Sequence, residues 1–177
     1  MDKLTLSQVE FAAVVAEVAH AGQHYGELDY IEHLKDVSGV LRRYDIDDEV
    51  ILVAGWLHDV VEDTKVGYKY IDKVFGPEVS DVVFRVTNEL GKNRREKFQA
   101  TSPKIAGHVR ATTVKLADRI AHYENGLLRD GSKLSMYVKE QSMFRGALFF
   151  EDHQGHVSEM WRDIDKLYKQ ALALKGA

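Results

Sequence analysis

The sequence contains no cysteine among its 177 residues, so it can form neither a disulfide nor a thiolate metal site. It also has no uncharged apolar run long enough to span a bilayer. The apolar stretch near the start is interrupted by Glu17, which indicates an amphipathic helix and not a signal peptide. These absences predict a cytoplasmic protein that is not inserted in a membrane.

Positive charge is not in excess either. The formal net charge is −4, with 45% hydrophobic and 29% charged residues, and this balance argues against a nucleic-acid partner. The one local basic cluster, GKNRREK at 91–97, is either a solvated segment or a loop that contacts phosphate. The length suits a single domain over 1–177 with one hydrophobic core. A homo-oligomer is left open.

What the sequence does contain is a succession of helix patterns separated by short breakers, and no strand pattern long enough to build a sheet. Ser7 is a capping candidate, and Pro77 stands where a first-turn proline is favoured. The polar stretch 91–103 is expected to be irregular. The predicted fold is an all-α, single-domain bundle. Its helices are expected over 8–21, 30–44, 47–63, 68–76, 77–90, 104–127, 133–151 and 157–175.

Four polar residues stand where a core-facing helix side would otherwise be apolar. They are His33 in the second predicted helix, His58 and Asp59 in the third, and Asp118 in the helix predicted for 104–127. Two imidazoles and two carboxylates suit a divalent ion such as manganese, iron, cobalt, zinc or magnesium. The imidazoles make magnesium the least favoured of these.

Each of these residues also has a simpler interpretation. A single histidine near an apolar face is commonly a hydrogen-bonded core residue. Asp118 could pair with Arg110 or Arg119, because a buried charge is costly without a partner. The combination of an isolated histidine, a His-Asp pair followed by two acids, and a framed aspartate favours the metal interpretation.

The order His33, His58-Asp59, Asp118 resembles the HD superfamily of metal-dependent phosphohydrolases. The motifs HDVVEDT and VKLADR look like the hydrolase domain of RelA/SpoT-type stringent-response proteins, including their small single-domain relatives. The segments AHAGQ, YIEHL and FGPEVSDVVFRVT are further matches. The resemblance covers about residues 8–125, while the C-terminal helices at about 132–175 fit the length of the small enzymes. It implies an HD-type helical bundle.

The resemblance also implies a cofactor and an activity. The metal is usually manganese, and the residues that would hold it here are His33, His58, Asp59 and Asp118. Glu62 and Asp63 would orient and activate the attacking water, since in one continuous helix each lies a turn beyond a metal ligand. Family members remove the 3′-pyrophosphate from guanosine tetra- and pentaphosphate, which leaves GDP or GTP.

The sequence departs from the family at expected substrate contacts. His24 and Tyr25 stand where the family usually carries a basic pair, Leu34 replaces a proline, and His122 replaces an asparagine. The remaining cations that could meet phosphate charge include Lys92, Arg94 and Arg95. The residues predicted to contact substrate are His24, Lys115, His122 and Asn125.

Because of these departures, three functions compete. The first is hydrolysis of guanosine 3′,5′-bis(diphosphate) to GDP or GTP and pyrophosphate. The second is phosphohydrolysis of another small nucleotide, such as a deoxynucleoside triphosphate, a nucleoside monophosphate or a phosphorylated dinucleotide. The third is a catalytically silent nucleotide-binding module, against which the water-activating pair Glu62 and Asp63 argues.

Overall fold

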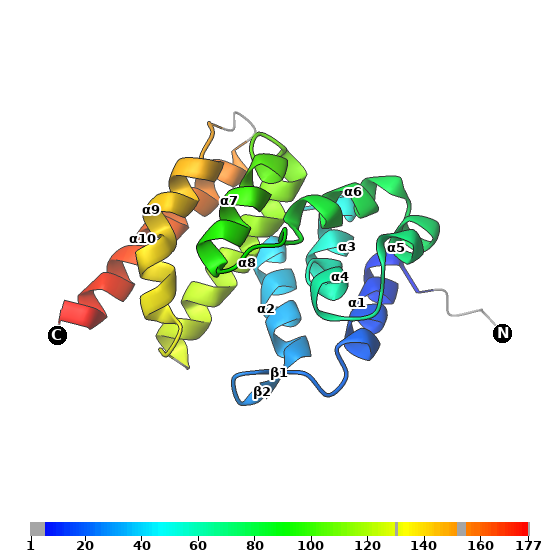
Figure 1. Ribbon diagram of the computed structural model, residues 1–177, viewed down its shortest axis with the longest axis horizontal. Coiled ribbons are helices and arrows are strands. Elements are labelled where there is room, and N and C mark those ends of the chain that lie inside the picture. The colour runs from blue at the N-terminus through cyan, green and yellow to red at the C-terminus, as the bar shows by residue number, and fades with distance from the viewer. Residues whose placement is uncertain (1–5, 130, 152–154, 177) are drawn as a thin grey trace.

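The long helix α8 (Val109–Leu128) lies at the centre of the fold (Figure 1). The computed structural model describes residues 6–129, 131–151 and 155–176. Helices α2 (Tyr30–Arg43), α3 (Glu49–Leu57) and α10 (His156–Gly176) all pack against α8. The predicted all-α fold is confirmed. Within these residues, no helix has the length and apolar character needed to cross a membrane.

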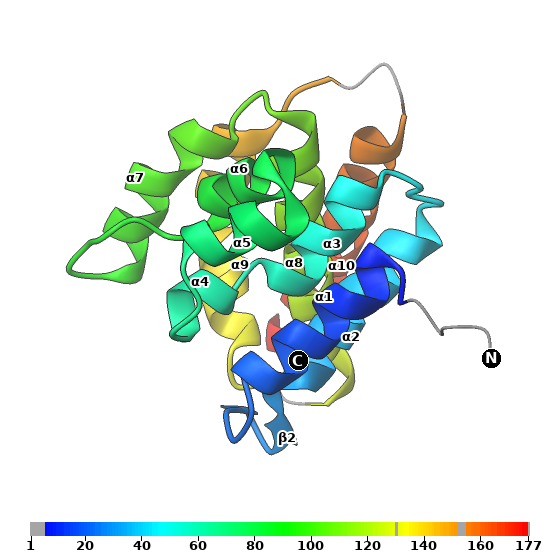
Figure 2. The same cartoon turned by 90° about the vertical axis from the view of Figure 1, so that its right-hand side faces the viewer.

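The remaining helices form two groups around this centre (Figure 1). On one side, α1 packs against α3, and α5 packs against α6, which also contacts α3 and α8. On the other side, α9 packs against α8 and α10, and α7 contacts α6 and α9. Figure 2 shows α1 at the front of the molecule, with α2 behind it. The bounds are α1 Gln8–Ala19, α4 Val60–Asp63, α5 Tyr68–Phe75, α6 Pro77–Val86, α7 Arg94–Ile105 and α9 Leu134–Leu148.

Several helix ends follow from local sequence. Ser7 caps α1 in a capping box: its hydroxyl accepts from the Glu10 amide, and the Glu10 carboxylate accepts from the Ser7 amide. Gly76 separates α5 from α6 with a φ of 89°, a region open mainly to glycine, and Pro77 then starts α6. These local rules confirm the predicted starts at Ser7 and Pro77.

One close helix contact brings the second and third predicted helices together. A Cβ placed on Gly55 of α3 would lie 2.6 Å from Leu41 Cδ1 of α2, so this approach requires a residue without a side chain or a shift of Leu41. Three leucines of these two helices are fully buried, namely Leu34, Leu41 and Leu57. The two helices in this contact carry His33, on α2, and position His58, which follows α3.

The predicted helix over 47–63 is wrong in one respect, because it breaks in its middle. Helix α3 ends at Leu57 and the short α4 begins at Val60, with His58 and Asp59 between them. The His58 ring donates from Nδ1 to the Gly55 carbonyl at 2.9 Å. In a continuous helix that carbonyl would accept from the Asp59 amide. The side chain therefore takes over a backbone acceptor at the break.

The polar stretch 91–103 was expected to be irregular, and this expectation is wrong. Most of it belongs to α7, which Asn93 caps by accepting from the Glu96 amide at 3.0 Å. The next helix was expected from residue 104, but α8 starts only at Val109. Gly107, with φ 74°, ends the preceding segment, and His108 caps α8.

Two further differences concern small elements. A small hairpin that was not predicted consists of two two-residue strands, β1 (His24–Tyr25) paired with β2 (Leu28–Asp29), and Gly26 turns it with a φ of 65°. The helix expected over 77–90 stops at Val86. The outermost residues of the predicted 1–177 domain, 1–5 and 177, lie outside the described part of the chain.

Candidate metal centre and substrate cleft

Three of the predicted metal ligands converge from three separate elements. His33 comes from α2, His58 from the turn after α3, and Asp118 from α8. One ligand atom from each lies within 4.8 Å of the other two. Asp118 Oδ1 is 3.4 Å from His33 Nε2 and 3.9 Å from His58 Nε2. All three residues are buried.

These atoms fit a divalent cation. His33 Nε2 and His58 Nε2 are buried and have no hydrogen-bond partner in the described structure, and both face Asp118 Oδ1. Buried polar atoms are nearly always satisfied, so two adjacent ones call for a shared partner. The bond from His58 Nδ1 to Gly55 leaves its Nε2 as the free, electron-donating nitrogen. Two nitrogens and one oxygen suit manganese, iron, cobalt or zinc.

Asp59 borders this set. Its Oδ2 lies 3.0 Å from His58 Nε2 and 3.8 Å from His33 Nε2, and it accepts a 2.6 Å hydrogen bond from the Tyr30 hydroxyl. Burial opposes charge on both partners, yet the nearby carboxylates raise the pKa of His58 to about 9. Despite burial, His58 likewise holds the pKa of Asp59 below its usual range. The carboxylates of Asp59 and Asp118 thus favour positive charge beside them.

Asp118 is held by a second contact. Its Oδ2 accepts from Lys115 Nζ at 2.9 Å, while Oδ1 faces the two histidines. Burial alone would raise the pKa of Asp118, but Lys115 and His122 keep it well below the usual value. The alternative pairing with arginine is wrong: Arg110 binds Asp48 and Glu78, and the Arg119 guanidinium lies 3.5 Å from Glu140.

Glu62 stands at the rim of the centre in a fixed orientation. Both its carboxylate oxygens accept from Asn88, one from the backbone amide and one from Nδ2, each at 3.1 Å. Asn88 follows α6, and its neighbour Glu89 is tied to α7 through Thr101 at 2.8 Å. The loop after α6 therefore orients this carboxylate.

Asp63 is one turn beyond Asp59, and its amide donates to the Asp59 carbonyl at 2.9 Å. Partial burial, and then the charges of Asp59 and Glu62, raise the pKa of Asp63. A raised pKa makes a carboxylate a better proton acceptor. The side-chain amide of Gln23 donates to the backbone carbonyl of Asp63 at 2.7 Å, which anchors the end of α4.

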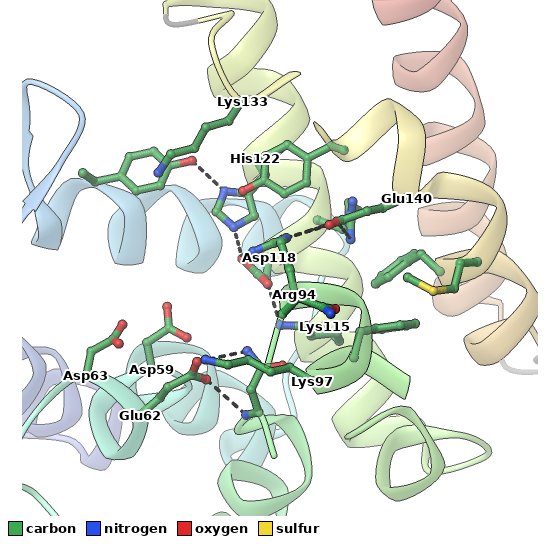
Figure 3. A pocket seen from close by; sticks show the side chains of 18 of the residues that line it. Asp59, Glu62, Asp63, Arg94, Lys97, Lys115, Asp118, His122, Lys133 and Glu140 are labelled. Carbon is green, nitrogen blue, oxygen red and sulfur yellow. Dashed lines mark hydrogen bonds and ion pairs between the residues drawn. The ribbon is translucent and has the colours of Figure 1, made fainter. Parts of the chain in front are cut away.

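A cavity of about 540 Å³ opens in front of these acids. Figure 3 shows Asp59, Glu62 and Asp63 grouped on one side of it and Arg94 and Lys115 on the other, and Lys97 also lines it. Within the described part of the chain, Lys97 forms no ion pair, whereas Arg94 Nε binds Glu140 at 2.7 Å. The cavity is thus lined by both carboxylates and cations. The basic segment 91–97 is therefore a cavity wall in part.

The predicted substrate residues divide between two neighbouring cavities. His24 and Lys115 line the first cavity, and Asn125 lines a second one of about 580 Å³. His122 borders both. The two cavities also share Tyr25, Lys133 and Tyr137. Arg95 lines neither of them.

Sequence reasoning missed two residues that hold the site. Tyr30 lies one helical turn before His33 inside the segment YIEHL, so its position on the same helix face could have identified it. Asn88 is 26 residues from Glu62, and no local pattern connects the two. Only the packing of α6 against α3 makes that contact visible.

Similarity to known proteins agrees with this geometry. A family model described as HD domain matches residues 12–125. The chain is 28% identical over 147 residues to guanosine-3′,5′-bis(diphosphate) 3′-pyrophosphohydrolase MESH1 of Drosophila melanogaster, covering 81% of this chain and 82% of that protein. It is 37% identical over 98 residues to a probable enzyme of the same activity from Synechocystis, covering 51% of this chain but 13% of that longer protein.

A solved structure has the same fold. It is a metazoan ortholog of SpoT, described as hydrolysing ppGpp, with a TM-score of 0.73, 24% identity, and coverage of 95% of this chain and 97% of that one. The similarity therefore extends through α9 and α10, beyond the residues that the HD family model matches.

Proposed function

The chain belongs to the HD domain family, and from this premise we propose that it is a metal-dependent pyrophosphohydrolase of guanosine 3′,5′-bis(diphosphate). The products are GDP, or GTP from the pentaphosphate, and inorganic pyrophosphate. The observation that carries the proposal is the convergence of two buried, unpartnered imidazole nitrogens and a buried carboxylate oxygen at a cavity lined by acids and cations.

The residues that would hold the metal are His33, His58, Asp118 and, at the rim, Asp59. Manganese is the proposed ion, because two imidazoles and carboxylates without thiolate suit it and the resembling family usually employs it. When bound, a divalent cation lowers the pKa of water and neutralises charge on phosphoryl oxygens. These four residues would thus hold the metal, and the other residues that line the cavity would act on substrate and water.

Glu62 and Asp63 are the proposed proton acceptors. Asn88 fixes both oxygens of Glu62, and the raised pKa of Asp63 suits it to take a proton from the attacking water. The water oxygen bonds to the phosphorus that is attached to the ribose 3′ oxygen. The bond from this phosphorus to the ribose 3′ oxygen breaks, and the ribose oxygen takes up a proton. Pyrophosphate leaves with no other reactant than water.

The opposite wall would bind the phosphates. Lys97 and Lys92 line the cavity from α7 and the segment before it, and Lys133 reaches it from the segment before α9. Together with Lys115 they offer positive charge to a substrate with many negative charges. We propose His24 and Asn125 as further substrate contacts, each at the edge of one of the two cavities.

A manganese-supplemented nucleotide panel tests the proposal. The purified chain is incubated with ppGpp, pppGpp, deoxynucleoside triphosphates, nucleoside monophosphates and a phosphorylated dinucleotide, with separate readouts for phosphate and pyrophosphate. The expected result is one pyrophosphate per GDP from ppGpp, abolished by EDTA and restored by manganese. Turnover of another nucleotide alone would favour the second function. Tight nucleotide binding without any turnover would favour a silent module.

A further inference from the structure

His122 contacts the metal centre through both of its ring nitrogens. Its Nε2 lies 2.9 Å from Asp118 Oδ1, the oxygen that faces His33 and His58. Its Nδ1 lies 2.6 Å from the hydroxyl of Tyr25, which belongs to strand β1. Figure 3 shows His122 between Asp118 and the cavity edge that Lys133 borders. A chain of contacts therefore connects the hairpin to a predicted metal ligand.

The partner atoms determine which nitrogen of His122 carries a proton in this series of contacts. A carboxylate oxygen can only accept, so His122 Nε2 must carry the proton that points at Asp118. Nδ1 is then the acceptor, and the Tyr25 hydroxyl must donate to it. The tyrosine thus selects the tautomer that presents an N–H to Asp118.

Both faces of the His122 ring are also occupied. The His33 ring stacks on it at 4.7 Å between centroids with 10° between the planes, and Tyr137 stacks at 4.6 Å with 18°. The ring is therefore fixed in orientation as well as in protonation. A residue held at both nitrogens and both faces is suited to positioning a neighbour and is poorly placed to follow a moving substrate.

We propose that Tyr25 and His122 form a positioning relay that fixes Asp118 and so raises the affinity of the centre for its divalent metal. This inference rests on the proposed function. Lys115 holds Asp118 Oδ2 from one side and His122 holds Oδ1 from the other, so the carboxylate cannot rotate. Partners that orient metal ligands in this way typically contribute about 10- to 100-fold in metal affinity.

The contacts of Tyr25 and His122 are coupled: the tyrosine supplies the proton that defines the histidine tautomer, and the histidine supplies the N–H that holds the aspartate.

Manganese titration by calorimetry tests the relay on the metal-free, full-length chain. His122→Phe keeps a ring between His33 and Tyr137 but removes both nitrogens, and it should weaken manganese binding about 10-fold or more. Tyr25→Phe removes one oxygen and should weaken binding by a smaller factor. Tyr70→Phe, on α5 and lining neither cavity, is the matched control and should leave the dissociation constant unchanged.

A double-mutant cycle separates the relay from general loosening of the site. Once His122 is replaced by phenylalanine, the additional change Tyr25→Phe should have no further effect on manganese affinity, because the hydroxyl then has no imidazole to orient. Full additivity of the two changes would overturn the relay. Tyr25→Phe alone keeps the test valid even if His122→Phe fails to fold.

Nitrogen NMR of the imidazole side chains gives a readout independent of metal and activity. In the metal-free wild type, His122 should show a protonated Nε2 and an unprotonated Nδ1, and Tyr25→Phe should mix the two tautomers. A pure Nδ1–H tautomer in the wild type would overturn the proposal. If the wild type binds manganese and every variant binds it equally well, the relay is contradicted but the proposed function is not. If the wild type binds no divalent metal, both the relay and the proposed function are contradicted.

Discussion

Asn88 donates from its backbone amide to one oxygen of Glu62 and from its side chain to the other, both at 3.1 Å. The pair joins the loop after α6 to the short helix α4, across 26 positions of sequence. A carboxylate held at both oxygens loses its freedom to rotate. The relationship therefore makes Asn88 a positioning residue for a proposed proton acceptor.

Asn88→Ala should lower kcat for ppGpp about 10-fold, because Glu62 loses a side-chain donor and with it a fixed orientation. Asn88→Asp should lower it further, since a carboxylate would then face a carboxylate. Manganese affinity, measured by calorimetry, should stay unchanged in both variants. Asn93→Ala, at the N-cap of α7, controls for loosening of the same loop. An Asn88→Asp enzyme with wild-type kcat would contradict the assigned role.

Glu62→Gln should retain manganese binding while kcat falls by about 100-fold or more, the usual contribution of a positioned general base. The amide has nearly the shape of the carboxylate but cannot accept a proton. The measurement pairs a manganese titration with steady-state pyrophosphate release. Full activity in this variant would show that Asp63 alone accepts the proton.

Asp59→Ala should abolish both manganese binding and hydrolysis. Its Oδ2 lies 3.0 Å from His58 Nε2, and its removal leaves the two imidazoles with one carboxylate fewer to attract a cation. Calorimetry and pyrophosphate release measure the two effects. Asp72→Ala, in α5, is a control of the same chemistry outside the cavity. Unaltered manganese affinity in Asp59→Ala would remove this residue from the centre.

Lys97→Met should raise the KM for ppGpp about 10-fold with a smaller change in kcat, because it removes one charge-assisted contact to phosphate and keeps the apolar stem. The effect should shrink as salt is added, since partly exposed charges are screened. Lys69→Met, on α5, lines neither cavity and serves as the control. Equal KM values for the two variants would exclude Lys97 from the phosphate wall.

Protonation of His108 should lower the free energy of unfolding in mild acid. Its Nδ1 accepts from the Ala111 amide at 3.2 Å and caps α8, and a protonated Nδ1 cannot accept. Burial, then Arg85 and more weakly Arg110, lower its pKa from 6.5, against the opposing pull of Asp81. A folded pKa below the unfolded one means that this stability is present above about pH 6.5 and is lost as the pH falls toward the folded pKa.

The His108 prediction is measured as the free energy of unfolding by urea between about pH 7.5 and 5. His108→Asn keeps a capping side chain that does not titrate in this range, so its free energy of unfolding should fall less steeply with acid than that of the wild type. Parallel curves for the two proteins would contradict the assignment. The wild-type slope should appear without metal or nucleotide present.

The sequence by itself determined the helical class, the separate capping and breaking signals at Ser7, Gly76 and Pro77, and the set of residues with the chemistry of a metal centre. These are local or compositional properties: capping depends on a few neighbouring residues, and ligand chemistry depends on residue type. The same local reasoning failed at His58, where a side chain replaces a backbone bond, and at 91–103, where the capping pair Asn93 and Glu96 outweighs a polar composition.

Only the tertiary structure decided which of these side chains meet. The contact of Asn88 with Glu62, of Tyr30 with Asp59, and of Tyr25 with His122 joins residues 26, 29 and 97 positions apart. Such contacts depend on how helices pack, and the close approach of α3 to α2 at Gly55 is one example of that packing. Helix packing is a property of whole interfaces, and no short segment of sequence encodes it.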